Sequence, residues 1–460
     1  MAKRLQQPYP TKGGTGVSML DKIKLQLAEQ QIEYLFCSFV ELTGAPKAKL
    51  VPVSHIEEFA RDGAGFAGFA CGDVGQGPQD PDICSVPDFR SLTILPWRKE
   101  VAWVTGNLHV NGKPWPLCPR TVLMRQLDQA RKHGYTVNIG VEPEFMLLKK
   151  SSSGEFAPWD TLDMLPKPCY DLRALHRNLD IMTTLLRYMQ ELGWDPYAND
   201  HEDANCQFEI NWTYSDALNT ADRHTFFKWM VRTVAEQQGL LATFMPKPFG
   251  NLTGNGAHVH LSLADENGKN LFFDSSADLG LSELGRWFMG GVLRHARALS
   301  ALVAPIVNSY KRLVRGAPRS GATWAPVYVT YGASNRTQMI RIPSPGRFEI
   351  RVVDGAANPY LAFAGIVAAG LDGIAQKIDP GAVNNDNLYE VPEEELSARG
   401  IGVLPATLAD AIDAMEKDPL MQGALGAEYA RMYMDVKRQE WLVHNRTVTP
   451  SEREYYLATY

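Results

Sequence analysis

Acidic residues spaced two apart give this sequence its first chemical signal. In VNIGVEPEFMLLK, Glu142 and Glu144 leave the same face of a predicted strand, whereas Val141 and Phe145 leave the other. Two parallel carboxylates repel each other unless a cation lies between them. A solvent-facing strand edge is the commoner explanation of such a pair on its own, so the pattern needs support from other segments.

Two later segments carry residues of a similar kind. In HEDANCQFE, Glu202 and Glu209 flank an acidic stretch, and Glu209 shares its strand parity with Gln207. In GNGAHVH, His258 and His260 leave one strand face behind a glycine turn. Taken singly, the first segment fits a polar loop that enters a half-buried strand, and a lone strand histidine is more often a hydrogen-bonding residue than a ligand.

The fourth segment, RFEIRVVDGAANP, places Arg347, Glu349 and Arg351 on one strand face, which a structural row of ion pairs would also explain. Taken together, the segments supply five glutamates and a histidine on separate strands. Two hard divalent cations need such a set, because Mg²⁺ and Mn²⁺ prefer oxygen donors and keep positions open for phosphate oxygens. The nearby arginines suit a transferring phosphoryl group.

The elements that must position these residues fall into two groups along the chain. The first ~115 residues predict a small β-rich unit with a hairpin over residues 32–54 and a second hairpin that turns at Asn111–Gly112. Residues 63–88, rich in glycine and proline, are a candidate functional loop between them. After Pro119, helices alternate with strands.

Two long helices are predicted in this second part from their capping residues. Asp171 is expected to cap a helix that runs to Gly193, and Asp222 one that runs to Gly239. The strands between and after them carry the acidic, histidine and arginine segments.

The length and composition predict a cytoplasmic protein with two unequal domains. The 460 residues exceed the roughly 250–300 at which one core stops growing. The net charge of -6, without a long basic block, argues against nucleic acid as the main partner. No apolar stretch approaches the ~20 residues of a membrane span, no signal peptide is evident, and the six cysteines lack zinc spacing.

The chemical segments, in their order, resemble those of the glutamine synthetases. The resemblance rests on VEPEF, HEDANCQFEI, ATFMPKP, GNGAHVHLSL, NSYKR, NRTQMIRIP and RFEIRVVDGAANPYL, and it extends over about residues 20–460. It implies an α+β fold with a small N-terminal β-grasp domain and a large catalytic domain whose curved antiparallel sheet is flanked by helices. We place a mobile tail at 1–18, the β-grasp domain at 19–116 and the catalytic ATP and metal domain at 117–460. The family also implies a homo-oligomeric ring, expected to be a dodecamer, with active sites between subunits.

Roles for individual residues follow from the resemblance alone. One metal would be held by Glu144, Glu202 and Glu209, and the other by Glu142, His258 and Glu349. Glutamate would be bound by Gly254, Arg312 and Arg351, with Tyr170 in the amine pocket. The nucleotide and its phosphates would be bound by His260, Ser262, Arg336, Arg341 and Arg347, with Tyr214 stacked on the adenine. The arginines with a catalytic role would be Arg312, Arg336, Arg341 and Arg351.

The implied reaction joins the γ-carboxylate of glutamate to an amine. The carboxylate attacks the γ-phosphate of ATP, and the acyl phosphate is then attacked by the amine. Phosphorylation supplies the leaving group that a carboxylate lacks, while two or more Mg²⁺ or Mn²⁺ ions neutralise phosphate oxygens. The partners are therefore expected to be glutamate, ATP as co-substrate and a small amine, with no nucleic acid and no membrane.

The sequence departs from the family where ammonium would bind. No acidic residue occurs between Arg312 and Phe348, where the usual flap has a glutamate, and Ala67 aligns loosely with an aspartate of the neighbouring subunit. A less acidic, more apolar pocket would hold an ammonium ion poorly and an alkyl group well. This favours the type III glutamine synthetases and the γ-glutamylmethylamide synthetases, with methylamine as the preferred amine.

Three alternatives remain at this level. The protein could be an ordinary glutamine synthetase that uses only ammonia, or Asp73, Asp80 or Asp82 could restore a carboxylate to the pocket. It could also be a catalytically silent homologue with a structural or sensing role, although such a protein would be expected to lack metal ligands. Tyr389, in a segment that resembles an adenylylated loop, is interpreted as an ordinary surface tyrosine.

Overall fold

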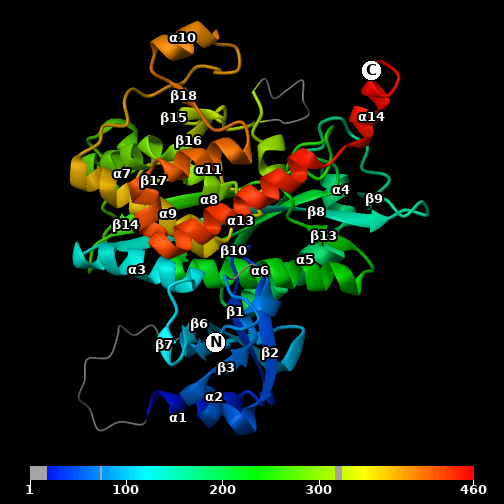
Figure 1. The fold of residues 1–460 in the computed structure, drawn as a ribbon, viewed down its shortest axis with the longest axis vertical. Coiled ribbons are helices and arrows are strands. Elements are labelled where there is room, and N and C mark those ends of the chain that lie inside the picture. The colour runs from blue at the N-terminus through cyan, green and yellow to red at the C-terminus, as the bar shows by residue number, and fades with distance from the viewer. Residues whose placement is uncertain (1–17, 73–74, 316–323) are drawn as a thin grey trace.

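The computed structural model describes residues 18–72, 75–315 and 324–460. The predicted tail therefore lies outside the described residues except for Ser18, whose side chain caps helix α1 (Met19–Glu29) by accepting a hydrogen bond from the Asp21 amide. The chain forms two sheets, a smaller one from its first part and a larger one from the rest (Figure 1). The structure is thus mixed α+β.

The smaller sheet contains both predicted hairpins. Its central strand order is β2-β1-β6-β4-β3, and β5 and β7 pair with β6. The strands are β1 (Tyr34–Val40), β2 (Pro46–Pro52), β3 (Ala64–Phe66), β4 (Ile83–Pro87), β5 (Thr93–Leu95), β6 (Arg98–Val110) and β7 (Lys113–Pro114). Strands β1 and β6 run parallel, and the other pairs are antiparallel. Helices α1 and α2 (Ile56–Asp62) cover this sheet, and their apolar residues share its core.

The larger sheet carries the chemical segments. Its central order is β10-β11-β8-β14-β17-β16-β15-β18, and β9, β12 and β13 pair with β8. The strands are β8 (Thr136–Lys150), β9 (Phe156–Pro158), β10 (Pro196–His201), β11 (Gln207–Trp212), β12 (Ser215–Asp216), β13 (Leu241–Thr243), β14 (Ala257–Ala264), β15 (Tyr328–Gly332), β16 (Gln338–Ser344), β17 (Arg347–Ile350) and β18 (Gly402–Val403). All its pairs are antiparallel except β15 with β16.

Helices flank the larger sheet and bury its apolar face. They are α3 (Pro119–Lys132), α4 (Leu172–Arg177), α5 (Leu179–Glu191), α6 (Ala217–Gln237), α7 (Glu283–Arg294), α8 (Ala296–Val303), α9 (Pro359–Gln376), α10 (Glu393–Ala398), α11 (Leu408–Glu416), α12 (Pro419–Leu425), α13 (Ala427–Arg446) and α14 (Pro450–Tyr456). Among the described helices, none is long and apolar enough to cross a membrane.

The two predicted long helices differ from the observed ones. Asp171 does cap a helix, but α4 ends after six residues at Asn178, where the chain breaks before α5 begins. The Asn178 side chain bonds backward to the Ala174 carbonyl and accepts from the Trp159 indole, so the break is stabilised by side-chain hydrogen bonds. The cap of α6 is Asp216, not Asp222. Asp222 lies inside the helix, where it is buried against Arg120.

The two sheets are joined by an aromatic interface and a buried ion pair. Helix α6 lies between them (Figure 1), and its Trp229 contacts Trp97 and Phe36 of the smaller sheet with ring centroids 5.2 and 5.6 Å apart. Arg120 donates to both oxygens of Asp222 and lies 3.0 Å from Asp88. The smaller sheet is therefore held firmly against the larger one. The chain boundaries assigned to the domains remain a prediction.

Candidate functional site

The site is built from side chains that face one another across adjacent strands of the larger sheet. Asp200 on β10 is directly opposite Glu209 on β11, and Glu209 is directly opposite Glu144 on β8. The register therefore lines up carboxylates on three neighbouring strands. Like charges in directly opposed positions destabilise a sheet unless a cation offsets them.

The next strands extend the row with imidazoles and a further carboxylate. Glu142 on β8 is opposite His258 on β14, and His260 is opposite Glu349 on β17. Glu349 is in turn opposite Arg341 on β16. Every second side chain of a strand lies on the same face of the sheet. Strand pairing therefore brings together residues that are more than 200 positions apart in the sequence.

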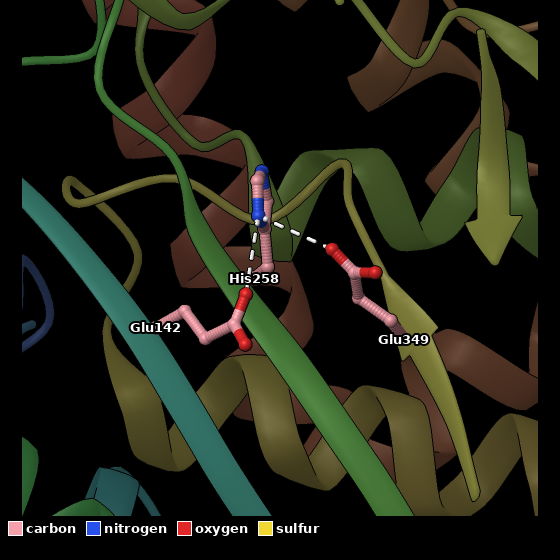
Figure 2. A group of neighbouring side chains, drawn as sticks. All are labelled: Glu142, His258 and Glu349. Atoms are coloured by element: carbon pink, nitrogen blue, oxygen red, sulfur yellow. Dashed lines mark ion pairs between the residues drawn. The ribbon is translucent and has the colours of Figure 1, made fainter. Parts of the chain in front are cut away.

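His258 lies at the centre of this row, between Glu142 and Glu349 (Figure 2). Its Nδ1 atom is 3.3 Å from Glu349 Oε1 and 3.8 Å from Glu142 Oε2. Its Nε2 atom is 3.8 Å from Glu144 Oε1. Two groups place their ligand atoms within 4.8 Å of one another: Glu142 with His258 and Glu349, and Glu144 with Glu209 and His258. The spacing suits one divalent cation in each group.

Glu202 stands apart from these two groups. Among the residues that the structure describes, no group of three or more ligand atoms within 4.8 Å includes Glu202. It is nevertheless close to them. Burial raises the pKa of Glu202, and the nearby charges of Glu144 and Asp200 raise it further. The predicted ligand set is therefore brought together except for Glu202, which lies at its margin.

The charges differ between the two sides of the site. Although burial alone would raise the pKa of Glu349, the guanidinium of Arg351 and the imidazoles hold that pKa at about 2. Burial and the charges of neighbouring carboxylates raise the pKa of Glu209 and bring that of Asp200 to about 6. No ion pair joins Asp200, Glu202 or Glu209 to a basic side chain in the described ranges. A metal ion would supply positive charge that offsets the repulsion between these carboxylates.

Several buried polar atoms around the site have no hydrogen-bond partner among the described residues. Nδ1 of His260 is one of them, whereas Nε2 of the same ring lies 2.8 Å from Glu142 Oε1. The Nε atoms of Arg341 and Arg351 are likewise buried and unsatisfied. Buried donors are rarely left without a partner, so these atoms indicate that a ligand completes the site. Metal ions and an anionic nucleotide fit the residues present.

A glycine keeps the centre of the site open. A Cβ atom on Gly256 would lie 2.7 Å from His258 Nε2, 2.9 Å from Glu144 Oε1 and 2.9 Å from Arg312 Nη2. Contacts this short would force these side-chain ends to move, so glycine at this position leaves the space between the histidine, the carboxylate and the guanidinium free. The backbone amide of Gly256 donates to Glu144 Oε2 at 2.8 Å and fixes its position.

The predicted glutamate-binding residues lie beside this space. A Cβ atom on Gly254 would be 2.1 Å from the Pro246 carbonyl oxygen, so this position also requires glycine. Arg312 is buried, donates to the carbonyls of Arg351 and Val352, and places Nη2 3.4 Å from His258 Nε2. Arg351 donates to Glu349 at 2.6 Å.

Tyr170 lies on the other side of the carboxylate row. Its amide donates to the His201 carbonyl at 2.8 Å, its side chain is 71% exposed, and its backbone has a positive φ of 63°. Burial of the hydroxyl and the charges of Cys169, Glu202 and Asp200 raise the pKa of Tyr170 to about 12, and the charge of Arg336 opposes this rise. Tyr170 and Arg336 therefore lie on the carboxylate side of the site.

The predicted nucleotide-binding residues occupy the far ends of the strands. Tyr214 is 60% exposed and flanks Gly140, where a Cβ atom would meet the Cβ atoms of Tyr214 at 3.4 Å and His260 at 3.9 Å. Ser262 is paired with Asn138 two positions beyond His260. Arg347 is exposed and donates to Ser344.

Two site residues were missed in the sequence. Asp200 joins the carboxylate row through its pairing with Glu209. The only sign of this in the sequence was its position two residues before Glu202, which is the spacing of side chains on one face of a strand. Gln207 is fully buried and donates to Glu144 Oε2 at 2.8 Å and to the carbonyl of Gly254 at 3.0 Å, so it ties the carboxylate to the glycine turn. It was noted only for its strand parity with Glu209.

Other predicted positions lie away from this row or outside the described ranges. Ala67 precedes a short helical turn in the smaller sheet. The central part of the flap, residues 316–323, and Asp73 lie outside the described residues. Tyr389 is partly buried and donates to the Ala325 carbonyl at 2.8 Å.

Comparisons with known proteins agree with this geometry. The family described as glutamine synthetase, catalytic domain, matches residues 116–456. A glutamine synthetase of Rhizobium leguminosarum bv. phaseoli is 46% identical over 93% of this chain and 97% of its own length. A glutamate–methylamine ligase of Methyloversatilis universalis is 45% identical over 94% of this chain and 97% of its own length.

A solved structure supports the same relationship in three dimensions. The structure of a GmaS/ADP complex superposes with a TM-score of 0.89 at 47% identity, and the match covers 94% of this chain and 99% of the other. The predicted α+β class is therefore confirmed. The match runs through both sheets, so it supports the whole arrangement and not the metal-binding strands alone.

Proposed function

Because this chain belongs to the glutamine synthetase family, we propose that it is an ATP-dependent ligase that joins the γ-carboxylate of L-glutamate to a small amine. The reaction passes through γ-glutamyl phosphate and forms ADP. The observation that carries the proposal is the cluster around His258, where four glutamates converge from three further strands beside two arginines. A silent homologue would have no need of these buried, mutually repelling carboxylates.

Metal ions would be held at two adjacent positions, and His258 would be a ligand in the first of them only. Glu142 and Glu349 would complete one, and Glu144 with Glu209 the other, with Glu202 at the margin of the second. Bound Mg²⁺ or Mn²⁺ would neutralise phosphate oxygens during transfer. Which ion occupies the site and whether Glu202 binds it directly belong to this proposal.

The chain's own donors would orient the substrates. Arg312 and Arg351 lie next to the space that Gly256 keeps open, and they would bind the carboxylates of glutamate. Arg341, Arg336 and Arg347 would meet the phosphates, and Tyr214 would stack on the adenine. The unsatisfied Nε atoms of Arg341 and Arg351 support these roles, since each can donate to a ligand oxygen without breaking its bond to Glu349.

The preferred amine is proposed to be methylamine. The lack of acidic residues between Arg312 and Phe348 removes one attraction for ammonium. The likeness to a glutamate–methylamine ligase and to GmaS structures is consistent with this choice.

A second candidate is glutamine synthesis from ammonia. Asp200 favours it, because this carboxylate belongs to the row on the Tyr170 side and has no basic partner there. Relatives named glutamine synthetase are as similar as the methylamine ligase, so sequence identity does not separate the two activities.

The remaining proposals concern assembly, domains and location. We propose a cytoplasmic homo-oligomeric ring, a dodecamer, in which residues 19–116 form the β-grasp domain and contribute to a neighbour's active site. Residues 117–460 form the catalytic domain. Mass photometry of the purified protein tests the ring directly.

The central experiment is a steady-state assay of phosphate release. Phosphate release should require glutamate, ATP, a divalent cation and a small amine, such as ammonia or methylamine, all at once. Methionine sulfoximine should inhibit only when ATP is present, because its phosphorylated form resembles the tetrahedral adduct and should bind far more tightly than glutamate. Inhibition that is independent of ATP would contradict the acyl phosphate route.

A further inference from the structure

The turn between β10 and β11 presents the acidic side of the site. It runs from Glu202 to Cys206, and Glu209 follows two residues after β11 begins. Cys206 has a φ of 59°, a left-handed conformation that a residue with a Cβ atom rarely adopts. The turn also brings Glu202 and Glu209 close to Glu144 and Asp200, whose charges repel them. Something outside the turn must hold it.

Asp163 makes contacts that could hold it. This residue lies in the connection between β9 and α4 and is 7% exposed. Its Oδ2 atom lies 2.7 Å from His201 Nε2, at the end of β10, and accepts from the Cys206 amide at 2.6 Å, just before β11. Its Oδ1 atom accepts from Asn205 Nδ2 at 3.2 Å. One buried carboxylate thus connects both ends of the turn.

His201 passes this constraint on to Glu202. The ring is completely buried, and Nδ1 lies 2.8 Å from the Glu202 carbonyl oxygen. The imidazole therefore links the Asp163 carboxylate to the backbone of Glu202. Its edge-on contact with Phe208, with centroids 5.1 Å apart, fixes the ring orientation from the other side. Phe208 is the residue directly before Glu209.

We propose that Asp163 is a positioning residue for the metal site: through His201 and Cys206 it holds the β10–β11 turn so that Glu209 and Glu202 face Glu144. This inference rests on the proposed metal-dependent function. Asp163 does not touch a ligand atom, and its effect should fall on the group formed by Glu144, Glu209 and His258. The affinity for a metal ion of the other group, formed by Glu142, His258 and Glu349, should stay unchanged.

The test measures metal binding directly, by electron paramagnetic resonance of Mn²⁺ titrated into the full-length protein. Asp163→Ala should weaken one class of Mn²⁺ site by roughly 10- to 100-fold, the range expected when the partner of a ligand is removed, and leave the other class within about twofold. Asp163→Asn keeps the size and one accepting oxygen, so it should fold like the wild type and show a smaller loss.

Asp160 offers a matched control. It lies three residues earlier and is equally buried at 7%, but its carboxylate pairs with Arg177 at 2.6 Å and accepts from the Leu162 amide. Only its backbone contacts the turn, through Cys206 Sγ, and an alanine keeps that backbone. Asp160→Ala should lower the melting temperature without weakening either Mn²⁺ site. The proposal is overturned if both Asp163 variants bind Mn²⁺ as the wild type does, or if Asp160→Ala loses as much affinity as Asp163→Ala.

Failure of the proposed function would give a different result. If the metal assignment were wrong, the wild type would not bind Mn²⁺ or Glu209→Ala would leave binding intact. If only the positioning role were wrong, the wild type would bind, Glu209→Ala would lose a site, and the Asp163 variants would keep both.

Discussion

Glu349 is fully buried between two guanidinium groups, and this placement determines how its loss would act. Arg341 and Arg351 each donate to a different oxygen, while His258 lies 3.3 Å away. The predicted ion-pair row is therefore only partly formed: Glu349 pairs with Arg351, but its second partner is Arg341 of β16 and not Arg347, which bonds to Ser344. In the proposed function the same carboxylate would also bind a metal ion.

We predict that Glu349→Ala and His258→Ala each lower activity at limiting Mn²⁺ by at least about 100-fold, because a hard cation loses a ligand and the phosphate it holds is misplaced. Glu349→Ala also leaves the buried Arg351 and the half-buried Arg341 without this carboxylate, which should cost about 3–5 kcal/mol of stability. Glu349→Gln, which keeps an accepting oxygen, should restore stability more than activity. Glu266→Ala, on an exposed turn, is the control. Normal Mn²⁺ dependence in both alanine variants would refute the ligand assignment.

A substitution at Gly256 tests the site while leaving every candidate metal ligand in place. In Gly256→Ala the new methyl group would occupy the space between His258, Glu144 and Arg312. We expect a folded protein whose kcat/KM for glutamate falls by about 100-fold, since displacing a reacting group by ~1 Å has an effect of that size. Gly402→Ala, where the nearest atom is 3.8 Å away, should change neither activity nor melting temperature. Equal kinetics for the two variants would show that this space is not used.

The sequence predicted which side chains converge better than it predicted the contacts around them, and the reason is physical. Glu142 and His258 could be found because strand parity and residue type are local properties. Asp163 and Gln207 could not, since their role depends on which distant segments become neighbours when the sheet forms. Asp200 was overlooked because it only becomes a site residue through its register with Glu209.

At the scale of elements, the same distinction explains the two corrected helices. A capping aspartate and a terminal glycine predict that a helix begins and ends, but not whether it is continuous. Asn178 breaks the helix because its side chain finds partners in Trp159 and Ala174, one of which lies in a different segment. Asp222 resembled a cap, but it is paired with Arg120 of another helix, and Asp216 makes the cap instead.

Helices α7, α8, α9 and α12 meet at His295, which gives a pH-dependent contribution to stability. Its Nδ1 atom lies 2.6 Å from Asp418 and its Nε2 atom 3.2 Å from Asp372. Burial lowers the pKa of His295, but hydrogen bonds to the two carboxylates outweigh it and raise the pKa above its ordinary 6.5. Because the folded-state pKa is raised, the contribution is complete below about pH 6.5 and is lost as the pH rises through the folded-state value.

We predict that His295→Gln destabilises the protein by about 1–2 kcal/mol at pH 6 and by less at pH 9, where the wild-type imidazole is neutral. Thermal unfolding of both proteins across this range measures the difference. His176→Gln, at an exposed position, should show no such trend. A difference that grows with pH would contradict the assigned charge state. Below about pH 4 a second loss is expected, since the pKa of Asp418 is lowered and its contribution disappears as the pH falls through that value.

At the scale of the whole molecule, the proposed amine pocket is the part that one chain would not complete. Ala67 precedes a turn next to β3, which lies at the lower end of the molecule, whereas β14 and β17 lie in its upper part (Figure 1). A role for Ala67 near an active site therefore requires a neighbouring subunit. This agrees with the proposed ring, in which the small sheet of one subunit meets the large sheet of the next.

Amine preference then depends on which carboxylates the assembled pocket contains. Near pH 7 both ammonia and methylamine are almost wholly protonated, so a pocket with fewer carboxylates attracts either cation weakly and lacks a base. A methyl group that is buried against Ala67 or Phe66 gains about 0.8 kcal/mol, which corresponds to roughly a fourfold preference. Asp200 would leave this preference unchanged, because it adds a carboxylate from the same chain that favours any ammonium ion regardless of its alkyl group.

We therefore predict that the wild type has a several-fold higher kcat/KM for methylamine than for ammonia at matched free-base concentration. Ala67→Asp should shift the ratio toward ammonia, because the added carboxylate attracts the smaller cation and removes apolar surface from the methyl group. Asp200→Asn should lower kcat/KM for both amines and leave their ratio nearly unchanged, since its charge acts on the ammonium group that they share. Ala70→Asp, on the same helical turn, controls for added charge alone. A wild type that prefers ammonia, together with a ratio that Ala67→Asp does not move, would assign the protein to glutamine synthesis, with Asp200 as the carboxylate that retains ammonium.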